Sequence, residues 1–404
     1  MDMVGAVVPA REASGANVTA LGLCCLVAAI EGFDLQSAGV AAPRLVAAFG
    51  LAPSQLGLFF SASTLGLLVG AAFGGRISDR LGRKRTLLAA VAVFGLMSIL
   101  TGLAARFDQL VAARLLTGVG LGGALPNLIA LVAETASPAY RGRAVAALYA
   151  GLPVGGVLAS LATLVDTDPG NWSGIFVLGG VAPLAVIPLL AAWLPAGGGP
   201  AAPGRPARSV PDALFGEGRA VATALLWTGF LLGLFVFYLL LNWLPSLLIS
   251  RGLPRADASW VQVAFNLGGA LGSVATGLLM DRWNRAASVA LIFGCSIAAL
   301  VLLAAVPASL ALMMAAGFLI GATASGAQMA LYALAPSCYP TEMRGTGVGA
   351  AVSVGRLGSV VGPLFAGVLL KAGQSPIEVL LVLVPLFALS GLAATLLACR
   401  VRPA

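Results

Sequence analysis

Long, uninterrupted apolar runs dominate the pattern of hydrophobic and polar residues along this chain. Twelve runs are each long enough to cross a bilayer as a helix, and short polar gaps separate them. They lack the strict alternation of barrel strands, so we expect an all-α membrane protein. The predicted spans cover roughly residues 19–42, 55–76, 86–105, 109–133, 142–165, 172–194, 221–249, 258–280, 286–305, 309–334, 344–371 and 376–399.

A polar stretch after the sixth run divides the chain. Residues 195–219 are rich in Gly, Pro and Arg and show no apolar period, which is typical of a linker. We therefore predict an N-terminal six-helix bundle over residues 1–194, a cytoplasmic linker over residues 195–219 and a C-terminal six-helix bundle over residues 220–404.

Composition and charge placement agree with a membrane protein. Hydrophobic residues make up 59% of the chain and charged residues 9%, whereas a soluble domain carries about 25% charged residues. Of the 23 Lys and Arg, sixteen lie in gaps on the side of both termini, five lie opposite, and Arg114 and Arg356 lie within spans. This bias places both termini in the cytoplasm. The net charge of +8 then reflects topology, and we expect no nucleic-acid partner.

The residue types needed for metal binding or catalysis are scarce. The chain has no histidine, and its five cysteines show neither a paired framework nor metal-ligand spacing. We therefore expect no metal, no cofactor and no enzymatic activity. We predict a monomer whose main partner is the lipid bilayer.

The two halves share a repeat. The stretch "GGRISDRLGRKR" (residues 74–85) follows the second predicted span, and "GLLMDRWNRAAS" (residues 277–288) follows the eighth. A second match, Arg141–Gly142 with Arg344–Gly345, has an offset of 203 residues, nearly that of the first. Two matches at nearly one offset indicate parallel six-span repeats, an organisation that secondary transporters use.

The first loop motif, together with "RLLTGVGLGG" (residues 114–123), resembles the major facilitator superfamily over essentially the whole chain. Within that superfamily "EGFD" (residues 31–34) is similar to a signature of the aromatic acid:proton symporters. The resemblance implies a major facilitator fold of two pseudo-symmetric six-helix bundles in a bacterial inner membrane. It also implies alternating-access import, with protons, of an aromatic carboxylate such as 3-(3-hydroxyphenyl)propionate or a related phenylpropionate or benzoate.

Two acids of the first span are candidates for proton coupling. Glu31 and Asp34 lie on neighbouring turns of one helical face. Each charge near mid-membrane costs about 2.5–3.5 kcal/mol, and two like charges so close resist joint ionisation. Either acid suits a proton carrier, although Asp34 could merely pair with an arginine. We add Arg114 to the coupling group, with an internal salt bridge that only holds the bundle together as the alternative.

Residues deep in other spans are candidates for binding the substrate. Arg356 can hold a carboxylate in bidentate geometry, or it can form an internal salt bridge. An aromatic ring also needs stacking and polar partners, for which we select Gln328, Tyr332, Asn242 and Trp243. Gln262 and Asn266 share a face of the eighth span, Tyr149 is a further candidate, and Pro245 is expected to break the seventh span. Phe235, Phe237 and Tyr238 are assigned to lipid-facing packing.

The repeated loop motif is expected to gate the cytoplasmic side. A carboxylate at a helix end can cap the N-terminus of another helix. The resemblance implies that Asp79 caps the span beginning at Arg344 and that Asp281 caps the span beginning at Arg141. The predicted gating residues are Gly75, Asp79, Arg83, Arg141, Asp281 and Arg344.

Three alternatives to an importer remain from the sequence. A proton-driven exporter of drugs or aromatic compounds shares the fold but has little need of a substrate-facing arginine. A transport-inactive sensor is disfavoured because the short loops and the linker leave no signalling domain. A membrane enzyme is disfavoured because no catalytic constellation is visible.

Overall fold

A computed structural model describes residues 13–136, 140–166, 168, 170–194, 210–340 and 343–401. The described chain is helical and contains no strand. Its long helices are α1 (Ala13–Phe49), α2 (Pro53–Leu81), α3 (Arg83–Gly102), α4 (Phe107–Thr135), α5 (Arg141–Val165), α6 (Gly174–Trp193), α8 (Ala220–Ser250), α9 (Arg255–Arg282), α10 (Arg285–Ala305), α11 (Leu310–Leu334), α12 (Arg344–Lys371) and α13 (Pro376–Arg400). Short elements are α7 (Val210–Phe215), η1 (Gly216–Gly218) and η2 (Ala335–Cys338).

Twelve of these helices are long and apolar enough to cross a membrane, which confirms the predicted number of spans. The first helix continues to Phe49, beyond the predicted end at residue 42, with Pro43 inside it. The expected break at Pro245 is wrong, because α8 runs through it to Ser250. Membrane helices tolerate proline where neighbouring groups satisfy the freed backbone.

Local sequence signals explain where several helices begin and end. Pro376 starts α13 behind a capping box, in which Ser375 Oγ accepts from Glu378 N and Ser375 N donates to the Glu378 carboxylate. Gly82 separates α2 from α3 with a φ of 84°, a backbone conformation that side chains disfavour. These signals place turns between spans, so each span forms as one continuous helix.

Glycine-mediated packing repeats in the two halves of the molecule. In the first half, Gly118 of α4 lies directly against the α2 backbone at Ser63. In the second half, Gly321 of α11 lies in the same way against the α9 backbone at Phe265. Small residues at such contacts let helix backbones approach closely. The glycine-rich α12 makes a similar close crossing, since Gly358 lies against the α8 backbone.

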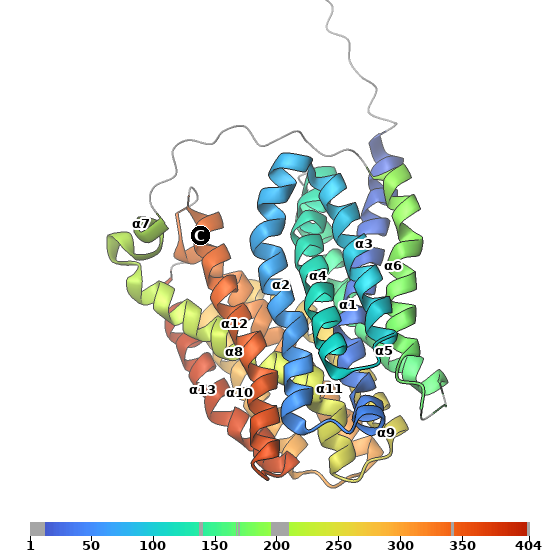
Figure 1. Ribbon diagram of the computed structural model, residues 1–404. Helices are drawn as coiled ribbons and strands as arrows, with labels where there is room; N and C mark the ends of the chain where they lie inside the picture. Colours follow the sequence, from blue (N-terminus) through green and yellow to red (C-terminus); the bar gives the residue numbers. More distant parts are fainter. Residues whose placement is uncertain are drawn as a thin grey trace, which may run out of the picture.

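The helices stand side by side as two bundles (Figure 1). We call the end at which α1 begins and α13 ends the terminal end, and the end with the α1–α2, α5–α6 and α8–α9 connections the distal end. The predicted domain boundaries stay a prediction. Linker residues 195–209 lie outside the described residues, and residues 210–218 form α7 and η1.

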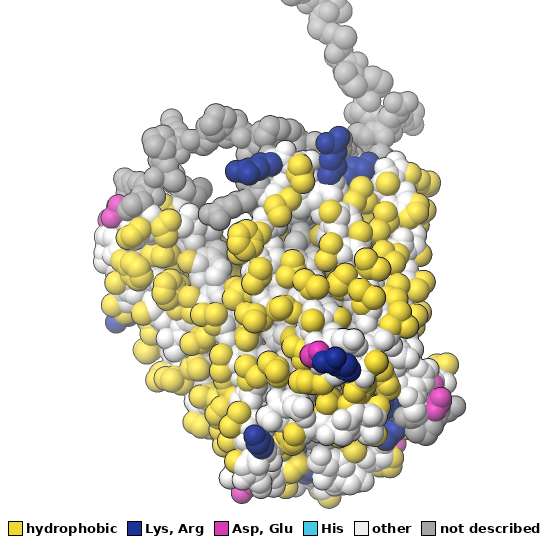
Figure 2. Space-filling model, viewed as in Figure 1, with side chains coloured by type: hydrophobic (Ala, Val, Ile, Leu, Met, Phe, Trp, Pro, Cys, Tyr) yellow, Lys and Arg dark blue, Asp and Glu magenta, His cyan; other side chains and the backbone are white. Residues whose placement is uncertain are grey.

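The lateral surface is apolar, as a protein in lipid requires. Figure 2 shows hydrophobic side chains over most of the visible face, with a few Lys and Arg near the terminal end and others scattered toward the distal end. Leu65, Leu96, Leu271 and Leu392 are among the leucines with large exposed fractions. Such a continuous apolar surface would be a liability in water and marks a membrane-facing belt.

The two halves meet along α1 with α8, α2 with α12, and α5 with α9. Hydrogen bonds between side chains and the opposite half lie in the distal part of these helices. Ser61 Oγ donates to Val360 O at 2.6 Å, and the hydroxyls of Thr163 and Ser259 lie 3.1 Å apart. The halves are therefore joined on the distal side.

Candidate functional site

A buried ion pair joins α1 to α4. Arg114 Nη1 donates to Asp34 Oδ2 at 3.0 Å, and the two side chains are 1% and 0% exposed. Ser98 Oγ donates to the other carboxylate oxygen at 2.6 Å. The Asp34 carboxylate thus has a charged partner and a neutral donor, as a buried carboxylate requires.

Aromatic rings cover the guanidinium of this pair. The Arg114 Cζ lies 5.7 Å from the Phe176 ring centroid and 5.9 Å from that of Phe59. Both distances are within the range for cation–π attraction. Arg114 Nη2 also donates to Asp34 O and Ser63 Oγ, whereas Nε has no hydrogen-bond partner. Arg114 therefore pairs with one acid of the first span, and its predicted role in proton coupling stays a prediction.

Glu31 lies one turn before Asp34 and differs sharply from it. Its side chain is 1% exposed, and neither carboxylate oxygen has a hydrogen-bond partner. Its charged neighbours are Arg356 and Asp34, which interact with it electrostatically without a direct bond. An ionised carboxylate in such a place is costly, so the neutral acid is the form that this site holds most readily.

Arg356 of α12 faces Glu31 from the other half. Its Nη1 donates to the Tyr238 hydroxyl at 2.6 Å, and its Cζ lies 5.7 Å from the centroid of the same ring. The sequence assignment of Tyr238 to lipid-facing packing is wrong, because the side chain is 7% exposed and turned toward Arg356. Arg356 has no carboxylate partner within salt-bridge distance among the described residues, so its positive charge is available to an anion.

Two further tyrosines lie near Arg356. Tyr149 of α5 interacts electrostatically with Tyr332 and Arg356 of the other half, yet it is 39% exposed. The Tyr332 ring packs edge-on against Phe230 with centroids 5.0 Å apart, which places an aromatic surface next to the free guanidinium.

The other predicted substrate residues fall into two groups. Gln328 is 7% exposed, and both atoms of its amide group lack hydrogen-bond partners. Asn242 and Trp243 are instead engaged, since Asn242 Nδ2 donates to Tyr238 O and Trp243 Nε1 donates to Pro363 O at 3.0 Å. Thus Gln328 has unused hydrogen-bonding capacity, whereas Trp243 and Asn242 are already bonded to backbone carbonyls.

Three amides form a cluster across the halves, which we call the amide clasp: Gln36 of α1 with Gln262 and Asn266 of α9. Gln36 Nε2 donates to Asn266 Oδ1 at 2.7 Å, and Asn266 Nδ2 returns a bond to Gln36 Oε1 at 2.8 Å. Gln262 Nε2 donates to the same Gln36 oxygen at 3.1 Å. The sequence analysis placed Gln262 and Asn266 on one helical face but did not select Gln36. Its position directly after "EGFDL", as a further polar residue within an apolar span, could have marked it as a candidate.

Gly156 of α5 packs directly against the amide clasp, so a substitution there tests the role of the clasp. A Cβ at this position would overlap the Gln36 amide and lie 2.7 Å from Asn266 Oδ1. We expect Gly156→Ala to displace Gln36, leaving buried amides unpaired at a cost of about 1–3 kcal/mol, and to favour separation of the halves at the distal end. The distance between spin labels on exposed Leu103 and Gln374, one in each half, measures that separation.

Gly294→Ala is the matched control, because nothing lies within 4 Å of a Cβ at that position. The control should keep the wild-type distance distribution. An unchanged distribution in Gly156→Ala would show that the clasp does not hold the distal side together.

The predicted gating residues are only partly described. The side chains of Asp79 and Arg141 lie outside what the structure describes. Arg83 forms an ion pair with Glu134, Asp281 is exposed, and Arg344 Nε has no hydrogen-bond partner. A Cβ added at Gly75 would meet nothing within 4 Å. The gate at the terminal end therefore stays a prediction.

A metal centre has no support in the described part of the chain, where no group of three or more Cys, Asp or Glu side chains gathers. The central arrangement is instead one of an acid without a hydrogen-bond partner, an arginine without an acidic partner, and aromatic rings. This set can exchange a proton and bind an organic anion, and it contains no nucleophile with an adjacent base.

The sequence matches the model of the Major Facilitator Superfamily over residues 24–259 and 247–404. The chain belongs to the major facilitator superfamily. Its relatives in the superfamily include a 3-(3-hydroxy-phenyl)propionate transporter of Escherichia coli strain K12, 45% identical over 97% of this chain and 96% of that protein. They also include a gallate transporter of Pseudomonas putida, 34% identical over 91% of this chain and 88% of that protein.

Solved structures of other transporters share the fold. A mutant of the nucleoside transporter NupG aligns with a TM-score of 0.78 at 11% identity, covering 95% of this chain and all (100%) of the other. A D-xylose-proton symporter aligns with a TM-score of 0.71 at 17% identity, covering 96% and 98%. The major facilitator fold is thus confirmed, and the family and its neighbours identify a transporter, not an enzyme.

Proposed function

We propose that this protein imports an aromatic carboxylate together with one or more protons across the bacterial inner membrane by alternating access. The observation that carries the proposal is the pairing of an unbonded buried acid, Glu31, with an arginine that lacks an acidic partner, Arg356, across the two halves. The relatives named above, transporters of a hydroxyphenylpropionate and of gallate, support the substrate class.

Competition for Arg356 supplies the coupling. The substrate carboxylate binds the guanidinium while Glu31 is protonated, because only one negative charge then faces Arg356. Loss of the proton creates a second carboxylate near the same arginine, and the two anions repel each other. Substrate and proton therefore bind cooperatively, while Asp34 keeps its ion pair with Arg114.

The aromatic part of the substrate lies against the Tyr332 ring in this proposal, at a distance in the 4.5–7 Å range typical of aromatic pairs. Phe230, which is buried, supports that ring from inside the protein. The unpartnered Gln328 amide, one helical turn from Tyr332, receives a ring hydroxyl. A site built to bond a hydroxyl discriminates strongly against an analogue without it. This assigns 3-(3-hydroxyphenyl)propionate as the favoured substrate over 3-phenylpropionate.

The orientation follows from the bias of Lys and Arg toward the side of both termini. With the terminal end in the cytoplasm, the distal hydrogen bonds between the halves hold the outward side closed. Opening to the outside then requires the amide clasp to break while the terminal end closes, which is rigid-body alternation of two bundles around one site.

The main alternative is a proton-driven exporter of drugs or aromatic compounds. The free Arg356 favours an anionic cargo, and an exporter of neutral or cationic drugs would leave that buried charge without use. We therefore rank import of an acid first.

Uptake of labelled 3-(3-hydroxyphenyl)propionate into proteoliposomes tests the proposal. We expect saturable uptake that an inward proton gradient accelerates and that 3-phenylpropionate inhibits more weakly than the unlabelled hydroxylated acid does. Arg356→Ala should remove uptake, whereas Lys371→Ala, a change of an exposed cation on the same helix, should leave it intact. Substrate movement outward against the proton gradient would support the exporter instead.

A further inference from the structure

A cavity lies between the halves at the distal end, away from Glu31 and Arg356. Its volume is about 250 Å³, and helices α1, α5, α8 and α9 or their ends all contribute to its wall. Apolar side chains, including Pro43, Pro245 and Ile249, line much of it. Ligand pockets commonly measure about 300–1,000 Å³, so this cavity suits a small, single-ring molecule.

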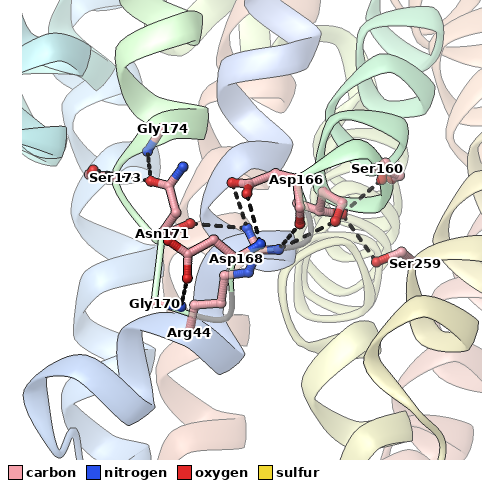
Figure 3. Close-up of polar contacts among 10 residues, drawn as sticks. Arg44, Ser160, Asp166, Asp168, Gly170, Asn171, Ser173, Gly174 and Ser259 are labelled. Atoms are coloured by element: carbon pink, nitrogen blue, oxygen red, sulfur yellow. Dashed lines mark hydrogen bonds and ion pairs between the residues drawn. The ribbon is translucent and has the colours of Figure 1, made fainter.

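Arg44 forms one side of the cavity and is fully engaged. Its guanidinium bonds the Asp166 carboxylate at 3.1 Å, the Asn171 carbonyl at 3.0 Å and the Asp166 carbonyl (Figure 3). These bonds fasten the distal part of α1 to the α5–α6 connection, and they neutralise Asp166. Asp168, also drawn in Figure 3, turns to the Gly170 amide of its own loop.

Arg255 lies on the other half, at the start of α9, and also lines the cavity. Its side chain is exposed, and it has no hydrogen-bond or ion-pair partner in the part of the chain that the structure describes. Because Arg44 and Asp166 cancel each other, the cavity carries one uncompensated positive charge beside apolar walls. That combination suits an organic anion with one carboxylate.

We propose that this distal cavity is an outer binding site for aromatic monocarboxylates, with the carboxylate on Arg255 and the ring between Pro43 and the α8 side chains Pro245 and Ile249. The outward orientation of the cavity and the class of acid rest on the proposed function. The site is separate from the central one, since it shares no residue with the surroundings of Glu31 and Arg356.

The position of the cavity gives the site a role in capture from outside. The Thr163–Ser259 hydrogen bond between the halves, drawn in Figure 3, joins two residues that line the cavity. An acid bound there already lies at the seam that must separate when the protein opens outward. The outer site thus raises the local concentration of substrate at the entrance before the central site becomes reachable.

Protection from chemical labelling tests the outer site. Ala256, exposed on the cavity wall next to Arg255, is changed to cysteine (Ala256→Cys) in a chain whose five native cysteines are serines. Right-side-out vesicles receive a membrane-impermeant maleimide with or without 3-phenylpropionate. At about twice the Kd of the acid, labelling should slow about threefold by mass action, whereas 3-phenylpropan-1-ol, which lacks the charge, should give no protection.

Two variants separate the outer site from the central one. Arg255→Gln should abolish protection and Arg255→Lys should keep it, while Arg356→Ala, which disables the central site, should leave protection unchanged. Equal labelling with and without the acid, or protection that disappears in Arg356→Ala, would overturn the outer site. Uptake measured in the same vesicles tests the proposed function separately, because protection without transport contradicts that function and leaves the outer site standing.

Discussion

Glu31→Gln should abolish proton-driven accumulation of the aromatic acid while preserving exchange of labelled for unlabelled substrate. Glutamine copies the shape of the neutral acid, but it cannot release a proton. The site then binds substrate beside Arg356 in both facing states, and the gradient no longer biases the cycle. Accumulation in proteoliposomes, measured with and without an inward proton gradient, should fall to the equilibrium level of an uncoupled carrier.

Counterflow in the same proteoliposomes distinguishes lost coupling from lost folding. Glu31→Gln should keep counterflow, and Glu378→Gln, which changes an exposed acid at the start of α13, should behave as wild type in both assays. Gradient-driven accumulation in Glu31→Gln equal to that of wild type would exclude Glu31 as the coupling acid.

Asp34→Asn should destabilise the protein by about 3–5 kcal/mol, because it leaves the buried Arg114 guanidinium without its counter-charge. The pair is 0% and 1% exposed, so water cannot replace the lost carboxylate. Thermal unfolding of purified protein in detergent measures the loss as a lower midpoint. The double variant Asp34→Leu/Arg114→Met, which removes both charges, should recover most of the stability.

An exposed pair supplies the matched control for this experiment. Arg106 and Asp108 form an ion pair at 2.8 Å with side chains that are 72% and 62% exposed. Asp108→Asn should therefore change stability by less than about 1 kcal/mol. An equal effect of Asp34→Asn and Asp108→Asn would show that burial of the Asp34–Arg114 pair does not stabilise the bundle.

The helical framework was predictable because it depends on local sequence. Apolar length and turn residues such as Gly82 mark each span, and these signals need no knowledge of distant contacts. An ion pair of Arg114 was also predictable, because a cation within an apolar run needs a counter-charge. Glu31 and Asp34 were the acidic candidates considered for it. In the structure Arg114 forms its ion pair with Asp34 and not with Glu31.

The partners of Arg356 and Gln36 were not predictable in the same way. Tyr238 lies 118 residues from Arg356, and Asn266 lies 230 residues from Gln36. The sequence pattern shows only that a tyrosine or glutamine sits in a span, not which face of its helix meets another bundle. The prediction of a helix break at Pro245 was wrong for a related reason. Contacts with neighbouring helices, which the sequence does not show, decide whether a proline breaks a membrane span.

Proton movement on addition of substrate is the sharpest test of whether this protein couples uptake of the acid to protons. Wild-type protein is reconstituted in proteoliposomes without a pre-formed gradient in weakly buffered medium, and the external pH is followed when 3-(3-hydroxyphenyl)propionate is added. We expect alkalinisation of the medium with wild-type protein and none with Glu31→Gln. Uptake of labelled acid by wild type with no accompanying pH change would contradict proton coupling.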